Sequence, residues 1–134
     1  MAVEYSVYRD WRVYVTRFTD LVSNDEMLQV YTDIFGHADF KPGFFELCDL
    51  RNTLTMDINI GALQAVSDMT EKAHHDGAQM TRIAYLVNKE MNALICKLYG
   101  VVAESGNTET TGRFYNVREA LAWLSIPDFP TEYI

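Results

Sequence analysis

Polar side chains that could bind a ligand lie at or just after the ends of two largely apolar stretches of the chain. They are, in sequence order, Asp49, Arg51, Asn52, Asn88 and Lys89. The stretches, Phe44–Leu50 and Ile83–Val87, are expected to be parallel strands. Their carboxyl ends then meet at the edge where open α/β sheets usually bind ligands. One interpretation is a site for a ligand or a protein partner. The other is an Asp49–Arg51 ion pair beside asparagines that only cap helices.

Two further polar residues lie in the segment after the first of these strands. Asp57 is expected to cap a helix, because its side chain can accept hydrogen bonds from free N–H groups of the first turn. The inward face of that helix is expected to contain Leu63, Val66, Met69 and Ala73. Asn59 lies at the helix start, where outward N–H groups attract anions. Asp57 and Asn59 therefore join the candidate binding residues.

The three histidines do not form a recognisable metal site. His74 and His75 are expected at the solvated end of this helix, just before Gly77, and adjacent helical residues do not face one another. His37 and Asp39 could supply only part of a ligand set, which nothing nearby in the sequence completes. We therefore predict no bound zinc or iron and no other cofactor.

Motifs for covalent or phosphoryl chemistry are also missing from the sequence. There is no Gly-x-Ser-x-Gly turn and no Gly-rich phosphate loop. Cys48 and Cys96 lie in apolar runs and are expected to be reduced core thiols. An enzyme with a site near Asp49 and Arg51 is therefore the weakest of the functions considered.

Length and charge narrow the choice further. The 134 residues fit one domain, and 19 acidic against 11 basic residues give a net charge of −8, which would repel nucleic acid. No run reaches the roughly 18 apolar residues of a membrane helix, and the amino terminus lacks the pattern of a signal peptide. We expect a cytoplasmic protein with no membrane span.

The periodicity of apolar residues predicts one α/β domain over residues 1–125 and a tail over 126–134. Alternation predicts an antiparallel hairpin over residues 3–18, and Ser23 and Glu26 have the spacing of a capping box. Further strands are expected over 44–50, 83–87 and 108–115, and helices over 57–77, 91–102 and 117–124, the last capped by Asn116. The result is a mixed sheet of about five strands, largely parallel after the hairpin, with about four helices packed on it.

This order of elements resembles the small bacterial STAS-like proteins, which are grouped with the sporulation anti-sigma-factor antagonist (SpoIIAA-like) fold. Three local sequences carry the resemblance: the strand end Leu47–Arg51, the helix after Asp57 and the closing block Arg113–Leu124. The likeness covers residues 3–125. It implies a SpoIIAA-like fold, in a group where many members have no assigned activity.

Phosphorylated members of the wider superfamily carry a Ser just after the acidic residue at this helix start. Here Ile58 and Asn59 follow Asp57, and neither has a hydroxyl. The comparison therefore implies a protein that is not switched by a kinase at this position.

Three functions remain open. The leading hypothesis is a non-catalytic regulatory or interaction module that binds a protein partner or a small ligand. Because the resemblance extends to lipid-carrier domains, the alternative is a carrier of a small apolar ligand. Methionines that could line its pocket are Met27, Met56, Met69, Met80 and Met91. A cavity of about 300 Å³ or more under the helices would favour the carrier.

The tail over residues 126–134 is rich in apolar side chains but broken by Pro127 and Pro130. Aromatic residues in a segment of this kind usually pack against a protein surface rather than remain in solvent. We expect the tail to pack on its own domain or on a twofold-related copy, and a homodimer is the assembly that we favour.

Overall fold

The chain folds around one five-stranded sheet. This computed structural model describes residues 3–57, 59–75, 80–88 and 109–134. The strands are β1 (Val3–Tyr8), β2 (Val13–Ser23), β3 (Phe45–Asp57), β4 (Thr81–Leu86) and β5 (Glu109–Phe114), in that spatial order. β1 and β2 are antiparallel, and each later strand is parallel to the one before it. The mixed sheet predicted from the sequence is therefore confirmed.

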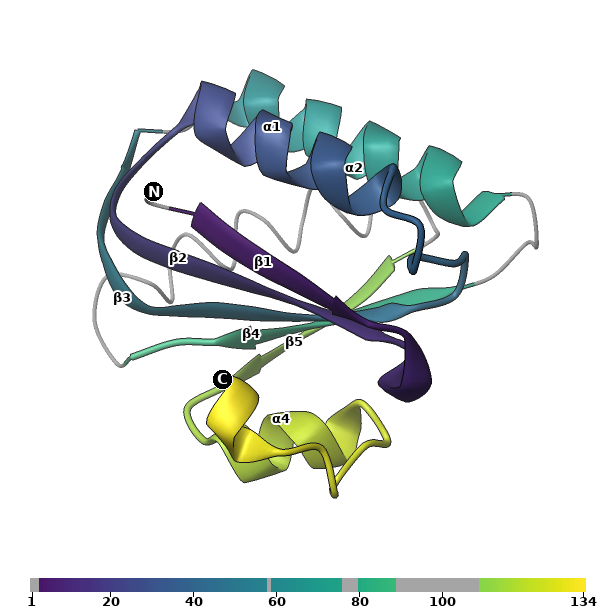
Figure 1. Cartoon of the computed structure of the whole chain (residues 1–134). Coiled ribbons are helices and arrows are strands. Elements are labelled where there is room, and N and C mark those ends of the chain that lie inside the picture. The colour runs from purple at the N-terminus through teal and green to yellow at the C-terminus, as the bar shows by residue number, and fades with distance from the viewer. Residues whose placement is uncertain (1–2, 58, 76–79, 89–108) are drawn as a thin grey trace.

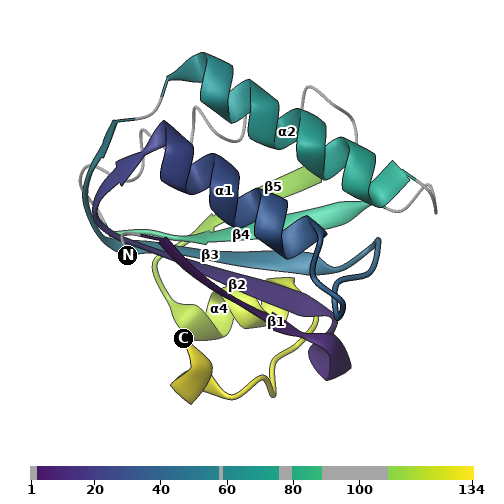
Figure 2. The same cartoon turned by 45° about the horizontal axis from the view of Figure 1, so that its top comes forward.

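Helices cover both faces of the sheet. Those described are α1 (Asn24–Phe35), α2 (Ile60–His75) and α4 (Val117–Trp123). α1 and α2 lie side by side on one face, and α4 lies on the other together with the yellow end of the chain (Figure 1, Figure 2). The helix expected over residues 91–102, and Cys96 within it, lie outside the described residues, so three of about four predicted helices are described. None of the described helices is long and apolar enough to cross a bilayer.

Alternation along the strands builds two cores, one on each face. Tyr14 and Cys48 belong to the core beneath α1 and α2, whereas Val15 and Leu47 belong to the core beneath α4. Cys48 is buried and forms no disulfide, as the sequence predicts. A strand buried on both faces reads as a nearly continuous apolar run, which is why β3 and β4 were recognisable.

The hairpin turn uses a short 3₁₀ helix, Arg9–Trp11, followed by Arg12 in the left-handed region with φ of 55°. This explains why no Gly or Asn marks the turn. The Arg12 N–H donates to the Arg9 carbonyl at 3.3 Å, and the Arg12 carbonyl accepts from the Phe45 N–H at 3.1 Å. The start of β3 thereby holds Arg12 in a backbone conformation that residues other than Gly rarely adopt.

The start of α1 follows the prediction. Ser23 Oγ accepts a hydrogen bond from the Glu26 N–H at 3.3 Å. The inward residues are buried as expected: Met27, Val30, Tyr31 and Ile34.

The predicted start of α2 is wrong. Asp57 is the last residue of β3, where its backbone pairs with Ser23 of β2, and α2 begins only at Ile60. Asn59 is the cap instead, since its Oδ1 accepts from the Ala62 N–H at 2.8 Å. The sequence could not reveal this because β3 is extended by ladder pairing with a distant strand rather than by its own apolar pattern. The expected inward face is otherwise correct: Leu63 and Val66 are buried, and Met69 and Ala73 pack partly buried against the core.

The tail packs on its own domain. Phe129 is only 2% exposed, and its ring makes edge-to-face contacts with Tyr8 and Trp11 at centroid distances of 5.1 and 5.5 Å. Tyr133 stacks on Tyr8 at 5.1 Å. These contacts extend the core beneath α4 as far as β1.

Candidate functional site

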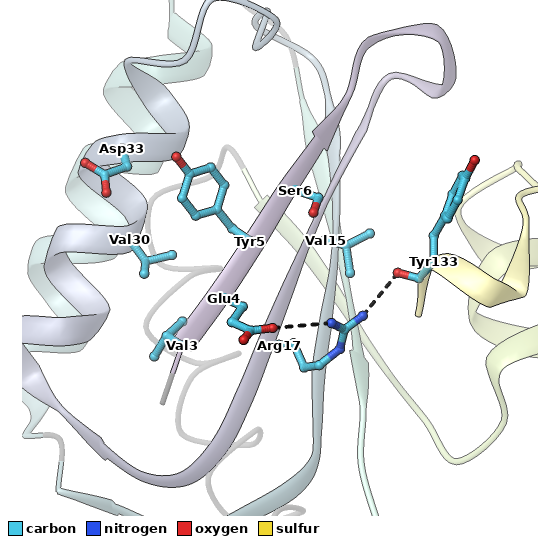
Figure 3. Close-up of a pocket in the computed structure, with 9 residues that line it drawn as sticks. All are labelled: Val3, Glu4, Tyr5, Ser6, Val15, Arg17, Val30, Asp33 and Tyr133. Carbon is cyan, nitrogen blue, oxygen red and sulfur yellow. Dashed lines mark hydrogen bonds and ion pairs between the residues drawn. The ribbon is translucent and has the colours of Figure 1, made fainter. Parts of the chain in front are cut away.

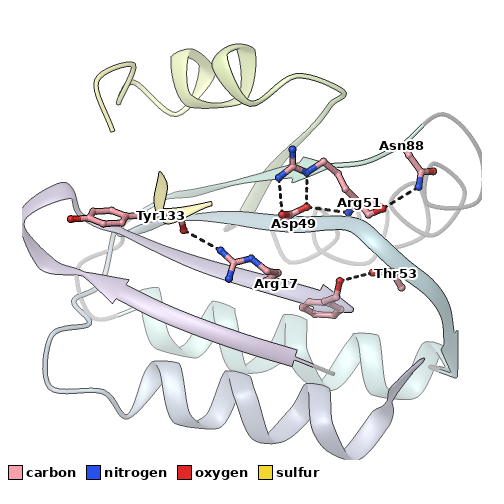
Figure 4. Close-up of polar contacts among 7 residues, drawn as sticks. Arg17, Asp49, Arg51, Thr53, Asn88 and Tyr133 are labelled. Atoms are coloured by element: carbon pink, nitrogen blue, oxygen red, sulfur yellow. Dashed lines mark hydrogen bonds and ion pairs between the residues drawn. The ribbon is translucent and has the colours of Figure 1, made fainter. Parts of the chain in front are cut away.

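Asp49 and Arg51 form a bidentate ion pair on β3 (Figure 4). Arg51 Nε lies 2.9 Å from Asp49 Oδ1, and Arg51 Nη2 lies 3.0 Å from Oδ2. The Arg51 backbone N–H donates to the same Oδ1 at 3.1 Å. Asp49 is only 2% exposed. Its hydrogen bond raises the pKa of Arg51, because the carboxylate stabilises the charged guanidinium.

Asn88 joins this pair, as the neighbouring strands β3 and β4 allow. Its Nδ2 donates to the Arg51 carbonyl at 3.3 Å. Asn52 follows Arg51 on β3, where its side chain is exposed and takes no part in these hydrogen bonds. Lys89 lies outside the described residues. Of the predicted set, the structure therefore brings together Asp49, Arg51 and Asn88.

The other two predicted residues lie elsewhere. Asp57 is six residues beyond Arg51 on β3, which corresponds to about 20 Å along an extended strand. Asn59 connects the starts of the two helices, since its N–H donates to Asn24 Oδ1 at 3.2 Å while its side chain caps α2. Asn59 is thus a structural cap distant from the ion pair.

Arg17 is a candidate that the sequence analysis missed. In the sheet register it lies on β2 between Glu4 of β1 and Asp49 of β3. Arg17 Nη1 lies 3.6 Å from Glu4 Oε2, and Nη2 donates to the Tyr133 carbonyl at 3.1 Å. We call Glu4, Arg17, Asp49 and Arg51 the charged row. It crosses three strands on the face that also carries α4 and the tail.

An irregular stretch of β2 borders the charged row. The pairing of β2 with β3 shifts register twice between Arg17 and Leu21, and Asp20 has φ of 54°. Within this stretch the Thr53 hydroxyl donates to the Phe18 carbonyl at 3.1 Å (Figure 4). Such bulges increase the local strand twist and are common beside functional sites.

A groove of about 390 Å³ follows the outer edge of β1 (Figure 3). On one side its wall contains Val30 and Asp33 of α1, and on the other it contains Arg17 and Tyr133. The remaining lining residues, from β1 and β2, are Val3, Glu4, Tyr5, Ser6 and Val15. Because consecutive residues of β1 line it, the groove reaches both faces of this strand and ends at the charged row.

Glu46 is a buried carboxyl beneath α1. Its Oε2 accepts from Thr16 Oγ1 at 2.7 Å and from the Tyr31 hydroxyl at 2.6 Å. Burial raises the pKa of Glu46 to about 7, although hydrogen bonds from Tyr31, Thr16 and Tyr14 lower it. Carboxyls that titrate near neutrality often serve acid–base chemistry. Glu46, however, is enclosed in the core, where in this conformation no substrate reaches it.

One sequence feature could have identified Arg17 and Glu46 as candidates. Each is a charged residue at a position where the strand pattern calls for an apolar one. Val13, Val15 and Arg17 share one face of β2, and a charge on a packed face needs a partner. Glu46 interrupts the apolar run of β3 in the same way. Their partners come from distant segments, which periodicity does not reveal.

The expectation that His74 lies on a solvated helix end is wrong. Its side chain is 0% exposed, and its Nδ1 accepts from the Gly43 N–H at 2.8 Å. Phe35 and Phe40 pack edge-on against the imidazole. Burial lowers the pKa of His74 to about 4, so the ring is neutral at pH 7. The loop before β3 covers the end of α2, and no helical periodicity could predict that cover.

His37 and Asp39 form a turn, and the side chain of His75 lies outside what the structure describes. His37 Nδ1 accepts from the Asp39 N–H at 3.1 Å, as expected of a turn. Across the ranges that the structure describes, no three His, Cys, Asp or Glu side chains lie together as a metal site.

Comparison with solved structures establishes the fold. The chain is similar to an uncharacterized protein of the DUF3478 family from Shewanella loihica PV-4, which is described as having a SpoIIAA-like fold. The match has a TM-score of 0.55 and covers 92% of this chain and 94% of that one. The fold is SpoIIAA-like. At 14% identity the likeness shows the fold alone.

The SpoIIAA-like assignment confirms the resemblance seen in the sequence. It adds no activity, because the similar protein is itself uncharacterized. No protein-family model matches the chain, and a search of curated proteins finds no match in sequence. Any function must therefore be argued from the charged row and the groove.

Proposed function

We propose that this SpoIIAA-like domain is a non-catalytic interaction module that binds a protein partner at the charged row and the adjoining groove. The observation that supports this most is the Asp49–Arg51 pair. The Asp49 carboxylate accepts three hydrogen bonds from Arg51, so it is not a free base for proton transfer. A fixed guanidinium in a row of charges that reaches the groove through Arg17 and Glu4 is suited to recognition instead.

The charged row retains groups that can contact a partner. The Arg51 side chain is 36% exposed, and only two of the five donors of its guanidinium face Asp49. Glu4 is 65% exposed at the other end of the row. Surface charges of this kind set specificity and the rate of association more than affinity.

A carrier of an apolar ligand has less support. The groove at β1 exceeds 300 Å³, but it opens at the sheet edge rather than under the helices. A second hollow of about 260 Å³, lined partly by Met69, lies on the surface between α1 and α2. Met27 is buried in the core and Met80 is exposed, so these three methionines have different surroundings. Met91 lies outside the described residues.

Binding is proposed to be constitutive and intracellular. At the helix start where related proteins carry a phosphorylated Ser, Asn59 uses its side chain as a cap. The buried Cys48, which forms no disulfide, suits a reducing compartment such as the cytoplasm. Since the tail already covers its own domain, the homodimer that we favour from the sequence is no longer required to bury it.

Native mass spectrometry of the protein purified from its own host tests this proposal. We expect a co-purifying protein whose recovery falls at least tenfold in Arg51→Ala. Arg118→Ala, at an exposed position of α4, is the matched control and should leave recovery unchanged. A bound lipid without a protein partner would support the carrier instead, and equal recovery with both variants would remove the charged row from the binding site.

A further inference from the structure

Among the residues that the structure describes, no strand pairs with the outer edge of β1. This strand is the outermost one of the sheet and pairs with β2 over six residues without a register shift. Every second residue of an edge strand directs its N–H and C=O away from its neighbour, so β1 offers about three of each over about 20 Å. Edges are usually blocked by Pro, by charged side chains, especially Lys, or by a bulge. The sequence of Val3–Tyr8, VEYSVY, contains neither Pro nor Lys, and Glu4 is its one charged residue.

The groove provides space on both sides of this edge. On the α1 side, Val3, Tyr5 and Val30 form a largely apolar wall (Figure 3). On the other side the wall contains Ser6 and Arg17. An extended segment that pairs with β1 sends alternate side chains to these two sides, which is the geometry of strand addition.

We propose that the outer edge of β1 binds an extended, basic segment of a partner protein as a sixth strand of the sheet. This inference rests on the proposed function and specifies its binding mode. Main-chain hydrogen bonds to β1 supply affinity, and side chains that enter the two halves of the groove supply specificity.

Charge determines which segment fits. Asp33 is exposed on the α1 side, and Glu4 is exposed on the opposite side. The basic group in the groove, Arg17, is already bonded to the Tyr133 carbonyl and close to Glu4. Lys or Arg in the added strand would therefore meet acidic groups on both sides, and the net charge of −8 attracts a basic partner.

A second copy of this chain is a poorer occupant. A twofold pairing of β1 with β1 would bring two acidic grooves together, each with its own Glu4 and Asp33. It would also join two chains that each carry a net charge of −8. Both the local repulsion between acidic side chains and the repulsion between the net charges oppose association.

The test needs a variant with a blocked edge. Proline removes a backbone N–H, and it is tolerated in an edge strand only where that N–H points outward. Ser6→Pro and Val7→Pro are made as two separate variants. One of them removes an N–H that points outward, and the other removes an N–H that is bonded to β2. The variant that unfolds near the wild-type temperature is the edge-blocked protein.

The probe is a displayed library of random twelve-residue peptides, selected on wild-type protein and remeasured as synthetic peptides by isothermal titration calorimetry. We expect enriched peptides with alternating apolar residues and at least one Lys or Arg. Their affinity should fall at least tenfold for the edge-blocked variant and for Asp33→Lys. It should be unchanged for Arg118→Ala.

Several results would overturn the inference. These are no enrichment, enriched peptides without basic residues, or peptides that bind the edge-blocked variant as tightly as wild type. Sedimentation of the wild type as a dimer that the edge block dissociates would assign the edge to a second copy. A native partner that requires Arg51 but tolerates the edge block would refute strand addition and leave the proposed function intact.

Discussion

At the scale of single residues, Glu46 is the group with the strongest consequence for stability. Its pKa is about 7 in the folded protein, against 4.5 for an ordinary glutamate, because burial disfavours the charge. Between these values the folded state holds a proton that the unfolded state has released. The stability that depends on this proton is complete below about pH 4.5 and is lost as the pH rises through about 7. The total is roughly 3 kcal/mol, at about 1.4 kcal/mol per pKa unit.

Glu46→Gln should remove this pH dependence, because an amide resembles the protonated carboxyl and does not titrate. We expect the stability difference between variant and wild type to move by roughly 3 kcal/mol in favour of the variant from pH 4.5 to pH 8. Urea unfolding at a series of pH values measures it. Glu132→Gln, at an exposed position, is the control. A difference that stays constant with pH would show that folding does not raise the pKa of Glu46.

His74 has the opposite effect. Burial lowers its pKa from 6.5 to about 4, so its contribution is present above pH 6.5 and is lost as the pH falls through about 4. In the wild type the two slopes therefore oppose each other between about pH 4.5 and 6.5. Because both proteins in the Glu46 comparison contain His74, its contribution cancels in the difference.

At the scale of elements, the caps show how local sequence and sheet pairing compete. Asn59, rather than Asp57, accepts a hydrogen bond from the first turn of α2 through its side chain. Its backbone N–H also donates to Asn24 at the start of α1. Asn59→Ala should lower the free energy of unfolding by about 1 kcal/mol, the usual cost of losing a cap. Thermal unfolding measures this, with the exposed Asn52→Ala as control. Equal stability of the two variants would mean that the observed cap contributes nothing.

The elements that depend on neighbours in sequence could be predicted. Ser23 and Glu26 mark the start of α1, and Asn116 accepts from the Arg118 and Glu119 N–H groups at the start of α4, because a cap is completed within one turn. The end of β3 at Asp57 could not be predicted. Its extension depends on pairing with β2, a contact between segments more than thirty residues apart.

The candidate site divides in the same way. Asp49, Arg51 and Asn88 could be predicted because each lies at or just after the end of the apolar run of its own strand. Arg17 required the register of β1, β2 and β3, and its bond to Tyr133 required the path of the tail. Neither the pairing of distant strands nor the path of the tail leaves a periodic pattern in the sequence. The sequence therefore predicted Asp49 and Arg51 of the charged row and missed Glu4 and Arg17.

At the scale of the whole molecule, the tail joins the second core to the groove. Phe129 anchors it between Tyr8 and Trp11, and this places the Tyr133 carbonyl 3.1 Å from Arg17. One wall of the groove along β1 therefore depends on packing between the two ends of the described chain. Loss of the anchor should open that wall while α1 and its side of the groove remain in place.

Phe129→Ala tests this dependence. Truncating a buried Phe removes roughly 3 kcal/mol or more of packing, so we expect the tail to detach and the free energy of unfolding to fall by as much as the tail contributed. Limited proteolysis with mass spectrometry should then show cleavage after residue 124 well before the sheet is cut. Glu132→Ala, in the same tail but exposed, should be cleaved as slowly as wild type. If the tail of Phe129→Ala resisted protease as long as the sheet does, its attachment would rest on contacts other than the Phe129 anchor, and the groove wall would not depend on it.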